Sequence, residues 1–172
     1  MKYQYKYCSN CGGLIDKKSE TLYLCPKCDF RIFISPKPGT GAMILNKFDQ
    51  LLVTRRSYNP WKGKWGIPGG FINGGENAPE ALSREIKEEL NITIMPNKFT
   101  YLGSFSEKYP YKGINYKLVN TYYTTKLTKK INIKLSEEAS EYDFLNLNEI
   151  NINDFADDLQ KAITELIRSK LH

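Results

Sequence analysis

Apolar residues recur along this chain with two different periods, and each period predicts a type of secondary structure. Leu82, Ile86 and Leu90 follow one another at a spacing of four, which is typical of the buried face of a helix over residues 78–90. A second amphipathic helix is predicted over residues 154–170 from Phe155, Leu159, Ile163, Leu166 and Ile167. Short runs of β-branched, aromatic and aliphatic residues predict strands over residues 21–24, 30–34, 41–45, 51–54, 101–105, 116–125 and 142–147.

Boundary signals refine these elements. Asn77 is suited to cap the first helix, Glu80 completes a capping box three residues later, and Pro79 fits the first turn. Residues 46–50 are expected to form a hairpin loop, and residues 60–70 are too rich in glycine and proline for regular structure. Strands flanked by a few helices predict an α/β or α+β domain.

Composition excludes several classes of protein. The chain has 172 residues, of which 41% are apolar and 26% charged, so neither a fibrous nor a fully disordered protein is expected. No run of apolar residues is long enough to span a membrane, and the first residues lack the apolar segment of a secretory signal. We therefore expect a cytoplasmic protein without membrane association. The single histidine is His172, so catalysis by a Ser-His-Asp or Cys-His arrangement within the chain is not expected.

Charge is distributed in blocks along a chain whose net charge is +6. Acidic residues predominate in residues 70–92 and 135–172, whereas basic residues predominate elsewhere. This distribution fits either an uneven surface or an acidic metal site bordered by basic residues, and the second arrangement suits a polyanionic substrate. The net charge is also compatible with a nucleic-acid partner.

All four cysteines lie near the start of the chain, in two C-x2-C pairs separated by thirteen residues, Cys8, Cys11, Cys25 and Cys28. Four thiolates at this spacing favour a structural Zn²⁺ site, with free buried thiols or two disulfides as the alternatives. About 35 residues are too few for a sufficient core, so the metal is expected to fold this segment. A proline-rich joint then predicts two domains, a zinc ribbon over residues 1–35 and a main domain over residues 36–172.

Three carboxylates share one side of the predicted helix over residues 78–90. Glu85, Glu88 and Glu89 fall within an arc of about 100°, on a different face from the apolar stripe. Taken alone, such a run fits a solvated helix surface better than it fits a metal site.

The surrounding residues resolve this choice by their resemblance to a known family. Gly70, then Glu76, then the run from Arg84 to Ile92 match the pattern G-x5-E-x7-R-E-U-x-E-E-x-G-U, where U is apolar. The chain thus resembles the Nudix hydrolases. Asn91 replaces the last glycine of the pattern, and because Asn is the next-best residue in the left-handed conformation, the helix end is expected to survive.

The resemblance implies a fold, a reaction and roles for particular residues. Nudix enzymes have a mixed β-sheet sandwiched between helices, and they hydrolyse a nucleoside diphosphate linked to another moiety with Mg²⁺ or Mn²⁺. The implied catalytic residues are Glu85, Glu89 and Glu138. The general base is either a glutamate of the box or one on a later loop, where Glu138 is the first choice and Glu141 the second. The metal ligands implied are the Gly70 carbonyl, Glu85, Glu88 and Glu89. Arg84 would orient Glu85, and Glu76 would be structural or bind metal through water.

A zinc ribbon before a Nudix domain is similar to the NADH pyrophosphatase subgroup. Those enzymes carry an SQPWPFPxS-like motif after the box, and residues 103–113 of this chain resemble that motif only loosely. ADP-ribose or NAD(H), giving AMP, is the expected substrate. Arg55 and Arg56 are candidates for binding phosphates, and Tyr109 and Tyr111 for stacking on a base, with Trp61 and Tyr116 as further aromatic candidates.

Two other functions remain open at this stage. One is a pyrophosphohydrolase for nucleoside triphosphates or capped RNA. The other is a nucleotide-sensing or nucleic-acid-binding protein that uses the zinc ribbon. A small nucleotide is the expected partner, nucleic acid is less favoured, and a homodimer is possible from the resemblance.

Overall fold

The computed structural model describes residues 5–129 and 131–171, the side chain of residue 171 excepted. Residues 1–4, 130 and His172 lie outside the described part of the chain. The chain divides into two compact units, Met1–Pro36 and Lys37–His172.

The N-terminal unit is a small antiparallel sheet of three short strands, β1 (Asp16–Lys17), β2 (Leu22–Leu24) and β3 (Arg31–Phe33). Its core contains the four cysteines together with a few apolar side chains, Ile15, Tyr23, Ile32 and Ile34. The strands expected over residues 21–24 and 30–34 are therefore present, each slightly shorter than predicted.

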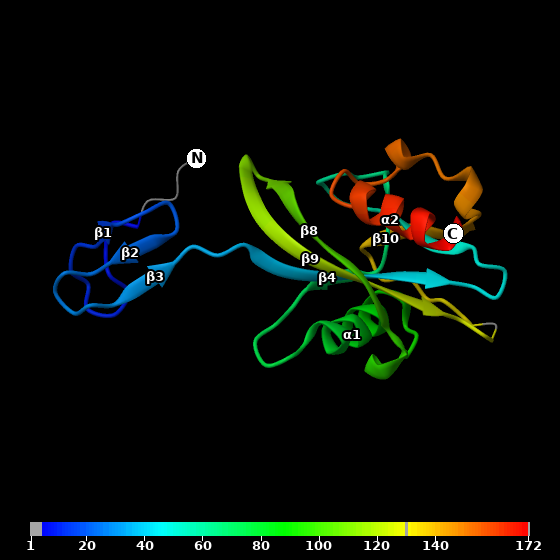
Figure 1. Cartoon of the computed structure of the whole chain (residues 1–172), viewed down its shortest axis with the longest axis horizontal. Coiled ribbons are helices and arrows are strands. Elements are labelled where there is room, and N and C mark those ends of the chain that lie inside the picture. The colour runs from blue at the N-terminus through cyan, green and yellow to red at the C-terminus, as the bar shows by residue number, and fades with distance from the viewer. Residues whose placement is uncertain (1–4, 130, 172) are drawn as a thin grey trace. The chain divides into compact units, whose positions relative to one another are not determined.

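The larger unit is built on a mixed sheet in the order β10-β5-β4-β9-β8 (Figure 1). The strands are β4 (Lys37–Leu45), β5 (Leu51–Arg56), β8 (Thr100–Tyr111), β9 (Ile114–Lys126) and β10 (Ala139–Leu145). β4 and β9 run parallel, and the other neighbours in this order are antiparallel. β8 and β9 form a long hairpin that extends well beyond the expected strand over residues 101–105, because backbone pairing continues through its polar residues.

One helix covers each face of this sheet (Figure 1). Helix α1 (Ala78–Leu90) packs Leu82, Ile86 and Leu90 against Ala42, Ile44 and Leu52. Helix α2 (Gln160–Leu171) packs Ile163 and Leu166 against the opposite face, in a core that includes Met43, Leu45, Leu51 and Val53. Alternate residues of β4 thus point into two different cores. The expected mixed sheet between helices is confirmed.

Helix α1 has the boundaries that the sequence predicts. The Asn77 side chain accepts from the backbone N–H of Glu80, and the Glu80 side chain accepts from the backbone N–H of Asn77, so the capping box is complete. At the other end Asn91 adopts the left-handed conformation with φ 56°, as expected for the residue that replaces glycine.

The structure also differs from the sequence prediction around β4, in β10, in the segment rich in glycine and proline, and at the start of α2. β4 begins at Lys37 rather than at residue 41, and β10 spans Ala139–Leu145 rather than residues 142–147. Residues 60–70 are not wholly irregular, because β6 (Trp65–Gly66) pairs with β5 and β7 (Gly69–Phe71) pairs with β4. Helix α2 begins at Gln160 rather than at residue 154. Residues 152–154 form a 3₁₀ turn, and the backbone N–H of Ala156 donates to the Trp65 carbonyl, so the chain here is held against β6.

Candidate active site

A cleft opens where two neighbouring strands of the large sheet diverge. β4 and β5 pair at Leu45 and Leu51, but further along β4 takes β7 as its partner and β5 takes β6. The cleft has a volume of about 470 Å³ and is lined by residues of all four strands, a size typical of small-molecule sites. Glu85 and Glu89 of α1 also line this cleft, together with residues of β9 and of the segment just before α2.

Burial changes the chemistry of two of the three helix carboxylates. Glu85 and Glu89 line the cleft, whereas Glu88 is exposed. Loss of water raises the pKa of Glu89 to about 8, and the nearby charges of Glu85 and Glu138 add to this rise. Burial also raises the pKa of Glu85, against the opposing effect of Arg84. Two partly buried carboxylates one helical turn apart repel each other unless a cation or protons intervene.

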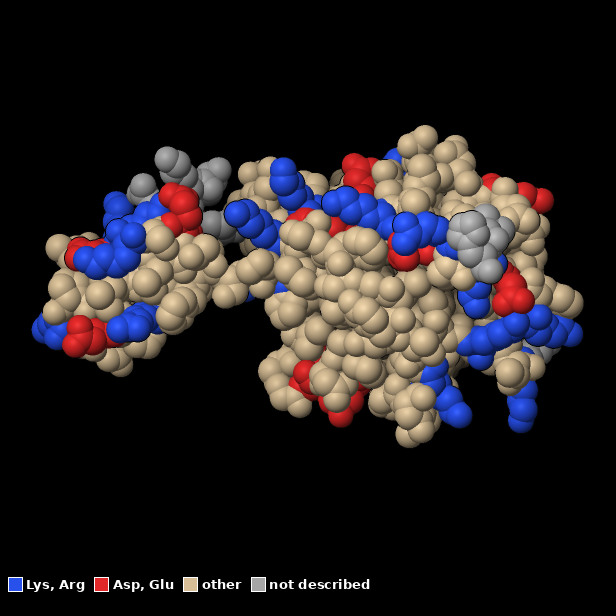
Figure 2. Space-filling model, viewed as in Figure 1, with Lys and Arg blue, Asp and Glu red and all other residues tan. Residues whose placement is uncertain are grey.

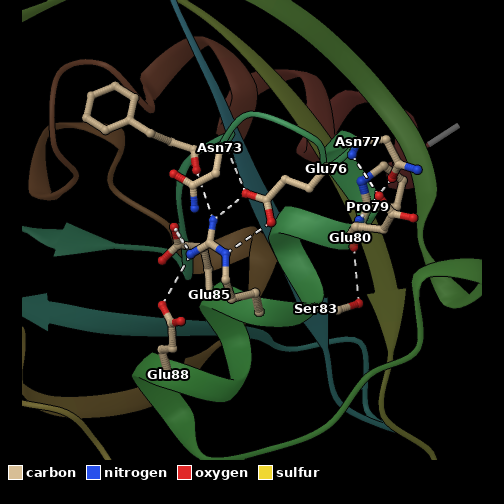
Figure 3. Close-up of polar contacts among 10 residues, drawn as sticks. Asn73, Glu76, Asn77, Pro79, Glu80, Ser83, Glu85 and Glu88 are labelled. Carbon is tan, nitrogen blue, oxygen red and sulfur yellow. Dashed lines mark hydrogen bonds and ion pairs between the residues drawn. The ribbon is translucent and has the colours of Figure 1, made fainter.

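The Arg84 guanidinium connects several of these acidic groups. It donates to Glu76 through two nitrogens, at 2.6 and 3.1 Å, and to Glu85 and Glu88 at 2.8 and 3.2 Å. Figure 3 shows Glu76, Glu85 and Glu88 converging from the loop and the helix. Glu76 also accepts from the backbone N–H of Asn73, so the loop before α1 is held to the helix. This geometry supports a positioning role for Arg84 and a structural role for Glu76.

Two glycines allow the loop backbone to approach the helix and the sheet closely. A Cβ on Gly70 would lie 2.4 Å from Oε1 of Glu85, and a Cβ on Gly69 would lie 2.2 Å from the Thr40 carbonyl. Gly69 has φ of 152° and its backbone interacts with the Glu89 carboxylate. The sequence pattern thus places glycine at a position where any side chain would displace Glu85.

An acidic loop reaches the same end of the cleft from far along the sequence. The backbone N–H groups of Lys134 and Ser136 donate to the carbonyls of Leu90 and Glu89, at 3.0 and 2.8 Å, and so satisfy carbonyls at the end of α1. This anchoring brings Glu138 to the lining of the cleft beside Glu85 and Glu89.

The other candidate base lies elsewhere. Glu141 pairs with the Arg55 guanidinium at 2.5 Å and does not line the cleft. Of these two candidates, the geometry therefore favours Glu138.

The two consecutive arginines have different surroundings because neighbouring residues of a strand point to opposite faces. Arg55 stacks on the Trp65 ring, with its guanidinium carbon 3.6 Å from the ring centroid, and donates to the Gly63 carbonyl. Arg56 lines the cleft, and its charge acts on both Glu89 and Asp158. Only Arg56 of this pair is placed to meet a ligand in the cleft.

Three of the predicted aromatic residues lie on the β8–β9 hairpin and divide between two hollows, whereas Trp61 lies in the loop between β5 and β6. Tyr109 lines the cleft and contacts Trp61 edge to face at 5.6 Å. Tyr111 and Tyr116 line a neighbouring groove of about 650 Å³, which also includes Phe71 and Tyr109. Of these three tyrosines, Tyr109 is thus the one that lines both the cleft and the neighbouring groove.

A polar cluster on the β8–β9 hairpin and at the start of α2 was not predicted from the sequence. The buried Asn120 amide donates to Glu107 at 2.5 Å, and the Tyr122 hydroxyl donates to the same carboxylate at 3.1 Å. Asn120, Tyr122 and Asp158 line the cleft. The sequence held one signal of this cluster. Asn120 places a polar amide at an inward position of the strand between Leu118 and Tyr122, where an apolar residue is expected.

The N-terminal unit holds a second candidate site. Among the described residues, the four cysteines form the one group of potential ligand atoms that all lie within 4.8 Å of one another. Cys8 and Cys28 are 3.7 Å apart at sulfur, and Cys11 and Cys25 are 3.6 Å apart. Tetrahedral zinc with Zn–S bonds of about 2.3 Å separates its sulfurs by about 3.8 Å, so the donor set fits Zn²⁺. The Asn10 amide donates to Cys28 and lowers the pKa of that thiol to about 6.

The donor set in the cleft fits a different ion. Its groups are carboxylate and carbonyl oxygens with no thiol or imidazole among them, which are the ligands that Mg²⁺ and Mn²⁺ prefer. Burial and mutual repulsion of Glu85 and Glu89 make a cation between them favourable.

Surface charge does not divide the molecule into large patches of one sign on the visible face. Figure 2 shows lysine and arginine side chains interspersed with aspartate and glutamate on both units. Among the helices of the described residues, none is both long and apolar enough to cross a membrane.

Comparison with known proteins identifies the family. The NUDIX domain model matches residues 35–166. An ADP-ribose pyrophosphatase of Methanocaldococcus jannaschii is 30% identical over 141 residues, which cover 82% of this chain and 79% of that protein. The chain therefore belongs to the Nudix family of hydrolases, and the resemblance seen in the sequence is confirmed.

Other relatives match over different lengths. The NAD-capped RNA hydrolase NudC of Pseudomonas fluorescens is 28% identical over 109 residues, which cover 63% of this chain but 38% of that protein. A crystal structure of a NUDIX hydrolase from Nitrosomonas europaea superposes with a TM-score of 0.65 at 26% identity, covering 94% of this chain and 92% of that one.

Proposed function

We propose that this protein is a divalent-metal-dependent pyrophosphatase that cleaves a nucleoside diphosphate linked to another moiety, with ADP-ribose or NAD(H) as substrate and AMP as product. One observation carries the proposal. The partly buried carboxylates of Glu85 and Glu89 line a ligand-sized cleft together with Glu138 and with Arg56, a cation suited to phosphate. The similarity to an ADP-ribose pyrophosphatase over most of both chains supports this substrate class.

The proposed ligands for Mg²⁺ or Mn²⁺ are Glu85, Glu89 and the Gly70 carbonyl, with Glu88 at the exposed edge. When bound, such an ion offsets the charge of the diphosphate and lowers the pKa of a water. Arg84 holds Glu85 in place through its bond to Oε1 at 2.8 Å. Arg56, which lines the same cleft, binds a phosphate oxygen.

The proposed general base is Glu138. Its loop is fixed to the end of α1 by the bond from Ser136 to the Glu89 carbonyl, while its side chain stays exposed. From the lining of the cleft, this carboxylate can take a proton from an attacking water. The raised pKa of Glu89 makes that residue less suited to this task in the same site.

The N-terminal unit is proposed to be a structural zinc ribbon. Four thiolates fill a tetrahedral ion and leave no position for substrate or water. The proposed domain boundary at residues 35–36 lies beside the division between the two compact units.

A second candidate function is hydrolysis of NAD-capped RNA. It is favoured by the matches to NudC, although these span 38% of the length of the P. fluorescens protein. Homodimerisation stays a prediction, which analytical ultracentrifugation would check.

The experiment is a product-resolved hydrolysis panel with Mg²⁺ and with Mn²⁺, covering ADP-ribose, NADH, NAD⁺, nucleoside triphosphates and NAD-capped RNA. We expect AMP from ADP-ribose or NADH, and we expect Glu89→Gln to abolish its release. Faster turnover of triphosphates would contradict the proposed substrate class. A folded, inactive protein that binds RNA would instead support a binding function.

A further inference from the structure

One acceptor atom in the cleft has no partner among the described residues. Oδ1 of Asp158 is buried, yet no hydrogen-bond donor reaches it. Asp158 itself lines the cleft, two residues before α2 begins. A buried polar atom without a partner is destabilising, and in native proteins such an exception calls for a physical explanation.

The nearby polar groups of β8 and β9 do not supply the missing donor, because they bond to one another and to the backbone carbonyl of Asp158. The Asn120 amide donates to Glu107 at 2.5 Å and contacts the Tyr122 hydroxyl at 3.3 Å. That hydroxyl bonds to Glu107 at 3.1 Å. The cluster thus presents an acceptor to the cleft, and a ligand there must bring an N–H or O–H group.

Electrostatics in the cleft favours a neutral donor at this position. Burial raises the pKa of Asp158 to about 6 even though the charge of Arg56 opposes the rise. Oδ1 of Asp158 is itself an acceptor, so a phosphate oxygen placed against it would find no donor. Because the charge of Arg56 acts on both Glu89 and Asp158, the diphosphate belongs beside Arg56, Glu85 and Glu89, and the uncharged part of the substrate belongs at Asp158.

The lining of the cleft also includes apolar side chains. Leu118, Leu159 and Ile67 line the same cleft, together with the ring of Tyr109. Apolar side chains in a cleft that also holds an unpartnered acceptor suit a nucleobase with an exocyclic amino group. A ribose, which carries several hydroxyls, would leave polar groups unpaired against these side chains.

We propose that Asp158 determines base specificity by accepting a hydrogen bond from the exocyclic amino group of the substrate's nucleobase, an inference that rests on the proposed function. Asn120, Glu107 and Tyr122 act as positioning residues, because their mutual bonds keep other donors away from Asp158. The substrate class is thereby narrowed to amino-bearing bases such as adenine, and bases with a keto group at that position are disfavoured.

The test compares binding of AMP and IMP by calorimetry and hydrolysis of ADP-ribose and its hypoxanthine analogue. We expect the wild type to prefer the amino base by about 10- to 100-fold in both measurements. Asp158→Asn is nearly isosteric, and its amide can donate to the keto oxygen, so the preference should fall to within about threefold or reverse. The matched control is Asp157→Asn, since Asp157 is exposed and does not line the cleft.

Equal binding of AMP and IMP by the wild type would overturn the proposal even if a variant failed to fold. So would an unchanged preference in a folded Asp158→Asn variant. If the wild type bound AMP and IMP alike but bound 3′-deoxy-AMP more weakly, Asp158 would accept from a ribose hydroxyl, and the proposal would also be overturned. Selective binding of AMP without any hydrolysis would leave this inference standing and refute the proposed function, so the two failures are distinguishable.

Discussion

A Cβ on Gly70 would lie 2.4 Å from Oε1 of Glu85. The loop before α1 and the helix therefore meet at a distance that only a glycine permits. Gly70 does not have positive φ, so the requirement arises from the contact rather than from backbone strain. This contact ties the glycine at the start of the Nudix pattern to the position of a carboxylate fifteen residues later.

Gly70→Ala should move the Glu85 carboxylate and lower kcat/KM for ADP-ribose by about 10- to 100-fold, because small displacements of catalytic groups are costly. Gly74→Ala is the matched control, since nothing lies within 4 Å of a Cβ there. Steady-state kinetics and thermal melts of both variants check this expectation. Equal kinetics for the two variants would contradict it.

Glu138→Gln removes the proposed general base without changing the shape of the side chain. We expect kcat to fall by about 100- to 10,000-fold, with little change in the melting temperature because the residue is exposed. The neighbouring Glu137→Gln should retain activity, since Glu137 is exposed and does not line the cleft. Full activity in the Glu138→Gln variant would indicate that a carboxylate of α1, and not Glu138, is the general base.

Arg56→Ala should raise KM by about 10-fold or more, because a charge-assisted bond to phosphate is lost. Arg55→Ala should change KM little and lower stability instead, since Arg55 stacks on Trp65 and pairs with Glu141. Kinetics together with chemical denaturation separate the two effects. A larger change in KM for the Arg55 variant would show that Arg55, and not Arg56, binds the phosphate.

Zinc content should be one ion per chain by elemental analysis. Cys25→Ser should bring it to zero and expose the remaining thiols to Ellman's reagent, because Cys25 is fully buried among the other three. Ser9→Ala, an exposed position within the first C-x2-C pair, should keep the ion. Full zinc content in the Cys25 variant would refute the proposed ligand set.

Glu107 should make stability depend on pH. Burial raises its pKa to about 7, an effect that the charge of Asp158 increases and that Asn120, Tyr122 and Lys161 oppose. The folded state thus binds a proton that the unfolded chain releases above its ordinary pKa of 4.5. The free energy of unfolding should therefore decrease as pH rises through this window to about 7.

Glu107→Gln lacks this proton, so the stability of the wild type relative to the variant should fall by about 2 kcal/mol between pH 5 and 8. Urea denaturation across this range measures the difference. A constant difference would show that Glu107 has an ordinary pKa.

The sequence alone predicted the elements whose causes are local. Helix α1 was placed correctly because its apolar spacing, its capping box and the αL residue Asn91 all act within a few residues. The cysteine pairs and the box carboxylates were found for the same reason, since their spacing itself reflects the chemistry. The start of α2 was misplaced because its apolar pattern continues to Phe155, while a bond to Trp65 holds that segment outside the helix.

Only the tertiary structure decided which residues share the cleft. Arg55 and Arg56 are equivalent in sequence, yet strand alternation and the divergence of β4 from β5 place Arg56 alone in the lining. Glu138 meets α1 because backbone bonds carry its loop there across a long stretch of chain. Asp158 and Asn120 come from distant segments with no motif between them. Their place in one cleft depends on how α2 packs on the sheet, and no local pattern encodes it.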